Sequence, residues 1–159
     1  MIRSTVAEQY WKMNQQSEVL ALPTLDFSEL VQSCDFVAER RENDSLQGFM
    51  LGISAGKGAD NFGYQWFLAR FDDFLFVDRV VVDQDFHRTG VATSLYDDAL
   101  HWCRQQGIAR IVCQIHDRPP NPAARALHLA LGFQEIESVM LPSRNIVTMF
   151  QRSTAIATP

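Results

Sequence analysis

Residues 76–93, FVDRVVVDQDFHRTGVAT, carry an apolar strand into a helix through a short basic turn. Such a junction aims several backbone N–H groups, the positive end of a helix dipole and basic side chains at one point. Small residues at Gly90 and Ala92 let a ligand approach the backbone closely, and Arg88 can form a bidentate contact with an anion. The sequence therefore predicts a phosphate-binding turn over residues 87–92.

The segments on either side of this turn show strand and helix patterns. Strands are expected at 35–41 and 46–55, joined as a hairpin by the polar turn 42–45, and at 74–82, 109–115, 133–140 and 145–151. Helices are expected at 5–17, from an N-cap at Asp26 through Cys34, at 90–106, and from an N-cap at Asn121, followed by Pro122, to Gly132. This order predicts an α/β fold with a mixed central sheet flanked by helices.

Length and composition favour a single soluble domain over residues 1–159. Of the 159 residues, 47% are hydrophobic and 21% charged, which is enough for one core. A net charge of −5 weighs against a nucleic-acid surface, and the apolar runs are too short to span a membrane. The three cysteines have no metal-ligand spacing, so we expect reduced, buried thiols and no metal. Because the N-terminus shows no signal-peptide pattern, the expected location is the cytoplasm.

Residues 56–73 combine glycines with many aromatic side chains and favour a long loop with room for a helical turn. Long loops inside compact domains often carry function. Two interpretations stay open at this point. In one, Tyr64 and Trp66 contact a substrate; in the other, the aromatic side chains pin the loop to the core.

The motif HRTGVA at 87–92 and the segment NPAARALHLALGF at 121–133 together resemble the two signatures of the GNAT acyl-CoA N-acyltransferases. The family pattern at the turn is Gln/Arg-x-x-Gly-x-Gly/Ala, and His87 departs from it at the first position. The second segment follows the first after one strand, as the family requires. The resemblance covers roughly residues 14–150, and FLFVDRVVV and DRPPNP are similar to segments in a bacterial group of predicted GNAT proteins.

The resemblance implies a single-domain GNAT fold in which the strands 74–82 and 109–115 splay apart around acetyl-CoA. The pantetheine amides would pair with main chain near Val80 and Val82, the turn would hold the pyrophosphate, and no metal is implied. The implied cofactor-binding residues are Val80, Val81, Val82, His87, Arg88, Thr89, Gly90, Val91, Ala92, Thr93 and Asn121.

Many GNAT enzymes carry a tyrosine four residues before the glycine of the second signature, which is Gly132 in this chain. That tyrosine donates a proton to the departing CoA thiolate. In this chain that position is His128. An imidazole, with an ordinary pKa near 6.5, can also donate a proton. Two interpretations stay open: His128 is the general acid, or it packs on its helix beside Ala124 and Leu131 with one nitrogen satisfied locally.

An amine acceptor must lose a proton before it attacks a thioester. Asp78, a carboxylate in an otherwise apolar strand, is the candidate base, and the alternative is an ion pair with Arg79 or with a neighbouring strand. His116 is a candidate for substrate contact, and so is Asp117 unless it caps the turn 118–120. Direct attack needs no covalent enzyme intermediate, so Cys113 is not the expected nucleophile.

The resulting hypothesis is an N-acetyltransferase that moves an acetyl group from acetyl-CoA to a primary amine of a small molecule, an amino acid derivative or a peptide. The histidines at 87 and 128 motivate an alternative, a CoA-binding sensor or regulatory module without turnover. A plain interaction domain would bind no CoA. We expect no nucleic-acid or membrane partner, and a homodimer stays open because the family often dimerises.

Overall fold

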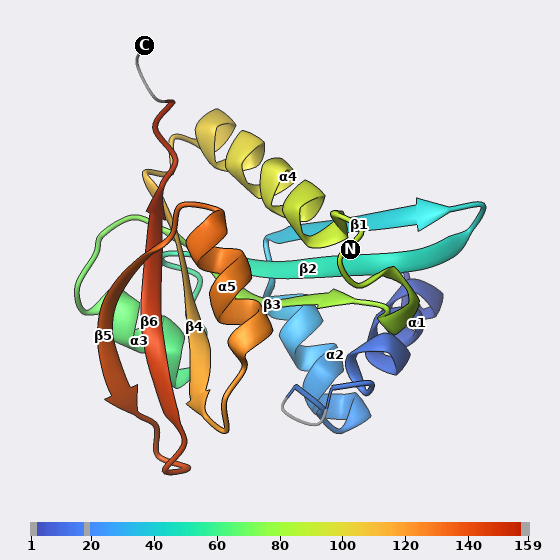
Figure 1. The fold of residues 1–159 in the computed structure, drawn as a ribbon, viewed down its shortest axis with the longest axis horizontal. Coiled ribbons are helices and arrows are strands. Elements are labelled where there is room, and N and C mark those ends of the chain that lie inside the picture. The colour runs from blue at the N-terminus through green and yellow to red at the C-terminus, as the bar shows by residue number, and fades with distance from the viewer. Residues whose placement is uncertain (1–2, 18–19, 157–159) are drawn as a thin grey trace. The chain divides into compact units, whose positions relative to one another are not determined.

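The computed structural model describes residues 3–17 and 20–156, so residues 1–2, 18–19 and 157–159 of the expected domain lie outside the described residues. Within these ranges, the helices are α1 (Ser4–Asn14), α2 (Thr24–Ser33), α3 (Phe62–Leu68), the 3-10 helix η1 (Gln84–Phe86), α4 (Val91–Gln106) and α5 (Pro122–Ala130). The strands are β1 (Phe36–Glu42), β2 (Ser45–Ser54), β3 (Leu75–Val82), β4 (Arg110–Arg118), β5 (Gln134–Met140) and β6 (Ile146–Ser153). They are ordered β1-β2-β3-β4-β6-β5 in the sheet (Figure 1).

The sheet is mixed, as the sequence predicts. β1 runs antiparallel to β2, and β4 and β5 both run antiparallel to β6, whereas β3 and β4 are parallel. The β3–β4 ladder is short, with Leu75 registered to Ile111 and Phe76 to Val112. The chain divides into two compact units directly after this ladder. The assignment of residues 1–159 to one domain stays a prediction.

The first unit contains the residues up to Ser54 together with Val77–Ala99. In it, α1 and α2 lie on one side of β2 and β3, and the beginning of α4 lies on the other (Figure 1). Because both faces of β2 are covered, residues 48–53 are all buried rather than alternating. The ring of Tyr10 stacks on Phe49 with centroids 4.5 Å apart, and Phe27 meets Phe49 edge-on at 6.3 Å. This aromatic core includes Val81 and so holds β3 in place.

The second unit contains Ala55–Phe76 and the residues from Leu100 onward. In it, α3 and α5 lie on opposite faces of the β4–β6–β5 part of the sheet (Figure 1). Side chains of β4 reach each helix in turn, since Gln114 approaches Gly63 of α3 and Asp117 pairs with Arg125 of α5. The alternation along the strand therefore sends its two sets of side chains into two different environments.

Residues 62–68 form a helix where the sequence favoured a long loop. Its first turn is capped by Asn61, whose Oδ1 accepts the backbone N–H of Tyr64 at 3.2 Å. The ring of Tyr64 is fully buried, with centroids 5.4 Å from Phe74 and 6.0 Å from Phe76. The buried positions 63, 64, 66 and 67 follow helical spacing over only seven residues, too few for a clear periodic signal.

The predicted caps had different outcomes. Asn121 does cap α5, because its Oδ1 accepts the N–H of Ala124 at 3.2 Å and Pro122 is the first helical residue. The prediction for Asp26 was wrong: α2 begins at Thr24, after Pro23, and Asp26 lies inside the first turn. A carboxylate is favourable there because of the helix dipole, which explains why the sequence signal was close but misplaced.

Truncating Phe49 to alanine is expected to lower the free energy of unfolding by about 3–5 kcal/mol, because it leaves a cavity between the Tyr10 and Phe27 rings. Urea denaturation followed by circular dichroism measures the change. Phe62→Ala is the matched control, since Phe62 lies on α3 and is 41% exposed, and it should cost less than about 1 kcal/mol. Equal losses in the two variants would contradict the assigned core.

Candidate functional site

The turn between β3 and α4 follows η1, in which the Asp83 side chain accepts the N–H of Asp85 at 2.9 Å. Residues 87–90 then reverse the chain, and all four are exposed. Arg88 and Gly90 both have left-handed backbone, with φ of +63° and +88°. This conformation is costly for most side chains and free for glycine, so Gly90 suits its place in the turn.

The backbone N–H groups of residues 88–93 make this turn a candidate anion site. Within residues 3–17 and 20–156, none of these six N–H groups donates a hydrogen bond of ordinary length and angle, and the first such bond of the helix is donated by Ser94 to the Gly90 carbonyl at 3.0 Å. Unpaired N–H groups at the start of a sixteen-residue helix carry its positive dipole end. A Cβ built on Gly90 would meet nothing within 4 Å, so the space beside these groups is open.

The side chains of the turn divide into two kinds. The Nε2 of His87 donates to the carbonyl of Val82 at 2.9 Å, and the Thr89 hydroxyl donates to the carbonyl of Phe86. His87 therefore holds the turn to the end of β3, and Thr89 holds it to η1. Arg88 is exposed, and its guanidinium has no ion-pair or hydrogen-bond partner among the described residues. It is the side chain of the turn best placed to add positive charge to an incoming anion.

Along β3, the side chain of Val81 is buried in the core of the first unit, while Val80 and Val82 are half-buried. The three valines offer no polar side-chain atoms. Any hydrogen bond that these residues form with a ligand would therefore come from main chain, which is the role that the resemblance implies.

Asp78 forms the ion pair that the sequence offered as an alternative to a catalytic role. Its Oδ1 lies 3.0 Å from Nε of Arg79, and the two side chains are 3% and 9% exposed. The Arg79 Nη1 also donates to Oδ1 of Asn14 and to the carbonyl of Leu20, both at 2.9 Å. The carboxylate of β3 is thus tied to the end of α1 and the segment after it. No sequence pattern indicates Asn14, which lies 65 residues from Arg79 in the chain.

Cys34 lies near this ion pair. Burial raises the pKa of its thiol to about 12, and the negative charge of Asp78 adds to the effect. The thiol is therefore protonated at neutral pH and is a poor nucleophile.

His128 lies on α5 in the second unit and is buried. Its Nδ1 donates to the carbonyl of Ala124 at 2.6 Å, and its ring meets Phe133 edge-on at 5.1 Å. Burial lowers the pKa of His128 below its ordinary value, while the bond to Ala124 opposes the shift. The local bond and the aromatic packing match the second of the two interpretations raised by the sequence.

The other candidates of the second unit fall into different surroundings. Tyr64 and Trp66 are buried in α3, and Arg70 lies 3.7 Å over the Trp66 ring, which favours the interpretation in which these aromatics pin the segment to the core. Burial lowers the pKa of His116, against the opposing charge of Asp117. His116 and Asn121 both line a polar pocket of about 320 Å³ at the start of α5.

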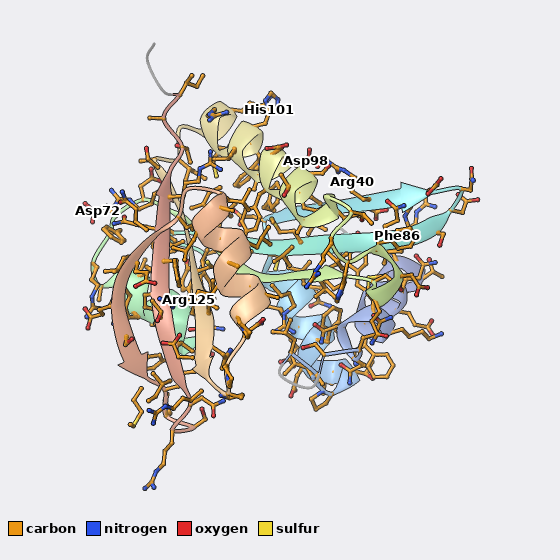
Figure 2. All side chains as sticks on the ribbon, in the orientation of Figure 1. Arg40, Asp72, Phe86, Asp98, His101 and Arg125 are labelled. Carbon is orange, nitrogen blue, oxygen red and sulfur yellow. The ribbon has the colours of Figure 1, made fainter. Side chains whose placement is uncertain are left out.

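An ion-pair group that the sequence did not indicate lies in that pocket. Arg125, labelled in Figure 2, pairs with Asp117 and with Glu135. Asp117 also accepts the hydroxyl of Thr148 at 2.6 Å, so its carboxylate is occupied by β6 and α5. The partners lie on four different elements, and the paired residues are 8, 10 and 31 residues apart in the chain.

The candidate residues are therefore distributed over both units. Asp78, the three valines and the turn belong to the first unit, whereas Tyr64, Trp66, His116, Asn121 and His128 belong to the second. In the described part of the chain, no group of three or more His, Cys, Asp or Glu side chains is arranged to hold a metal ion. None of the described helices is both long and apolar enough to cross a membrane.

Comparison with known proteins adds the family to this geometry. The sequence model of the Acetyltransferase (GNAT) family matches residues 6–133. The chain belongs to the GNAT acetyltransferase family. This assignment makes it an acyltransferase. No curated protein matches the chain at a significant level.

Solved structures share the GNAT fold at low sequence identity. The ribosomal-protein-S18-alanine N-acetyltransferase from Escherichia coli is 15% identical, with a TM-score of 0.73 over 99% of this chain and 93% of that one. An aminoglycoside 6'-N-acetyltransferase complexed with coenzyme A is 9% identical, with a TM-score of 0.72 over 99% and 95%. Arabidopsis thaliana Naa50, in complex with a CoA-peptide bisubstrate analogue, is 14% identical, with a TM-score of 0.71 over 96% and 95%.

The lowered pKa of His128 predicts a pH-dependent contribution to stability. Between that pKa and the unfolded-state value near 6.5, the unfolded state binds more protons than the folded state. The contribution of His128 to the free energy of unfolding is therefore complete above about pH 6.5 and is lost as the pH falls. His128→Phe should flatten the decline in unfolding free energy between pH 7 and 5 by up to about 1.4 kcal/mol per pH unit. Part of the pH dependence of the unfolding free energy should remain in this variant, because burial also lowers the pKa of His116.

Urea denaturation at several pH values measures this slope. His101→Gln, at an exposed position on α4, is the control and should keep the wild-type dependence. An unchanged slope in His128→Phe would contradict the burial and local hydrogen bond assigned to this histidine.

Proposed function

We propose that this GNAT protein transfers an acetyl group from acetyl-CoA to a primary amine by direct attack of the amine on the thioester. The observation that carries the proposal is the set of six unpaired N–H groups at residues 88–93. They stand at the start of α4 in a turn opened by the left-handed residues Arg88 and Gly90. This arrangement matches the need of a pyrophosphate for several N–H donors and a positive helix end.

The turn supplies the donor side of the reaction. The N–H groups of residues 88–93 would bind the pyrophosphate, and Arg88, which has no partner among the described residues, would add charge-assisted bonds. Main chain at Val80 and Val82 would pair with the pantetheine amides. When bound, acetyl-CoA supplies an acetyl group activated as a thioester. No side chain of the enzyme needs to form a covalent bond, which agrees with the protonated thiol of Cys34.

The acceptor side requires removal of a proton from an ammonium group. We assign this step to Asp78. Its Oδ1 lies 3.0 Å from Nε of Arg79, and a carboxylate is a group that can accept a proton from an ammonium. The same pairing fixes the carboxylate on β3, because Arg79 is itself held by Asn14 and Leu20. The attacking atom would then be the neutral amine nitrogen, and the CoA thiolate would leave.

The departing thiolate must be neutralised. A role for His128 in this step would require the cationic imidazole, whose formation burial disfavours. Protonation by His128 therefore predicts a rate that falls as pH rises through a pKa below 6.5. Without that role, the thiolate leaves unassisted or takes a proton from water.

The proposed acceptor is the primary amine of a small molecule, an amino acid derivative or a peptide. Among the structures that share the fold, one acts on the alanine of a ribosomal protein and another on an aminoglycoside. A panel of such amines, assayed by release of CoA thiol and by mass spectrometry of the products, would identify the class.

A pair of glycine variants tests the binding of the donor. Gly90 and Gly107 both have left-handed backbone, with φ of +88° and +73°, and a Cβ on either would meet nothing within 4 Å. Alanine should strain both positions alike, but only at position 90 would the methyl group intrude on the pyrophosphate. Calorimetry should show CoA affinity reduced by about tenfold or more in Gly90→Ala and unchanged in Gly107→Ala. Full affinity in a folded Gly90→Ala protein would rule out this binding mode.

Two further variants test the chemistry. Asp78→Asn should lower kcat by about 10²–10⁴-fold with little change in CoA affinity, as expected for loss of a general base. His128→Phe should leave kcat and its pH profile unchanged if the histidine only packs, and should remove the decline at rising pH if it is the acid. A folded Asp78→Asn variant with wild-type kcat would exclude Asp78 as the base.

A further inference from the structure

Arg40 connects the edge strand β1 to the beginning of α4. Its Nε donates to the hydroxyl of Ser94 at 2.6 Å, and its Nη2 donates to the carbonyl of the same residue at 3.1 Å. Its Nη1 reaches Oδ2 of Asp98 at 2.7 Å and the carbonyl of Glu39 at 2.9 Å. Figure 2 labels Arg40 and Asp98 side by side at this junction. One guanidinium therefore holds the first two turns of α4 to the sheet.

The residue opposite Arg40 on β2 contributes to the same junction. Arg40 is registered to Gly48, and a Cβ built on Gly48 would lie 2.8 Å from the carbonyl oxygen of Val81 and 2.9 Å from Cγ1 of Val91. The first residue of α4 thus packs where only a glycine leaves room. Arg40 and Gly48 therefore face each other on the β1–β2 hairpin and together set where α4 begins. Arg40 does so by hydrogen bonds, and Gly48 by close contact with Val91.

The charge of Arg40 also bears on the anion site. α4 carries Asp97 and Asp98 in its second turn, and their negative charges oppose binding of a phosphate at its N-terminus. Ser94 and Asp98 follow Val91 by three and seven residues, or about 4.5 Å and 10.5 Å along the helix axis. At about 10 Å, the charge of an exposed carboxylate is largely screened in physiological salt and acts on the N-terminus of the helix mainly at low ionic strength. The Asp98 carboxylate and, more weakly, Asp97 raise the pKa of Arg40. The positive charge of Arg40 and the negative charge of Asp98 therefore stabilise each other.

We propose that Arg40 is a positioning residue for the pyrophosphate site. It fixes the start of α4, and with it the N–H groups of residues 88–93, and it offsets the charge of Asp98 without touching the ligand. The inference rests on the proposed binding of CoA at this turn and adds a residue outside the family signatures.

Arg41 provides a matched control in the same strand. It follows Arg40 in sequence and points to the other side, where it pairs with Glu39 and donates to Oε1 of Gln9 at 2.8 Å. The side chains of Arg40 and Arg41 are 31% and 26% exposed. Loss of Arg41 therefore removes a comparable ion pair and leaves α4 untouched.

The test compares binding of CoA with binding of pantetheine, which lacks the pyrophosphate, by calorimetry on the full chain. Arg40→Gln should weaken CoA binding by about tenfold and leave pantetheine binding unchanged. Arg40→Lys, which keeps the charge but not the fork of nitrogens, should recover part of the loss. Arg41→Gln should bind both compounds as the wild type does.

Thermal melting of each variant reports its folding. If Arg40→Gln does not fold, Arg40→Lys and Ser94→Ala carry the test, and each should weaken CoA binding by about two- to fivefold. Wild-type CoA affinity in the folded Arg40 variants, or an equal loss of CoA and pantetheine affinity, would overturn the inference while the proposed function stands. A wild-type protein that binds no CoA would overturn both.

Discussion

The candidate site depends on one backbone constraint, the left-handed conformation of Arg88 and Gly90 between β3 and α4. It places the N–H groups of residues 88–93 in the turn and at the start of α4, where none of them donates a hydrogen bond of ordinary length and angle within the described ranges. Burying such groups without partners would be costly, and exposing them at a helix start costs little and suits an anion. The side chains of His87 and Thr89 hold this conformation through carbonyls of β3 and η1.

The hydrophobic core of the first unit gives this turn a fixed base. The rings of Tyr10, Phe27 and Phe49 pack on one face of the sheet with Val81 of β3. On the other face, Gly48 leaves room for Val91, and Arg40 binds Ser94 by hydrogen bonds and Asp98 by an ion pair. Both ends of the turn are therefore anchored, at the end of β3 and at the start of α4. A preorganised turn of this kind binds with less loss of conformational entropy than a mobile loop.

Local sequence patterns were enough to predict the features that depend only on neighbouring residues. The turn between β3 and α4, the Asn121 cap and the order of strands and helices follow from glycine conformation, capping chemistry and hydrophobic period, and the structure has them close to the expected residues. The family match to residues 6–133 confirms the resemblance that these motifs carried. α3 escaped prediction because seven residues give too little periodicity.

Contacts between distant residues were beyond the reach of local patterns. The bond from Arg79 to Asn14 spans 65 residues, and that from Arg40 to Asp98 spans 58. The roles of Asp78 and His128 depend on such surroundings, so the sequence left two interpretations of each. The structure gives Asp78 its ion pair and His128 its local bond, and kinetics must decide what each does in the reaction.

The central claim is that the N–H groups of residues 88–93 bind the pyrophosphate of CoA. A chain of 159 residues is well suited to NMR of individual backbone amides. On titration with CoA, the amide resonances of residues 88–93 should shift the most, whereas titration with pantetheine should leave them near their starting positions. Saturation with CoA that moves other amides and leaves these six unchanged would contradict it.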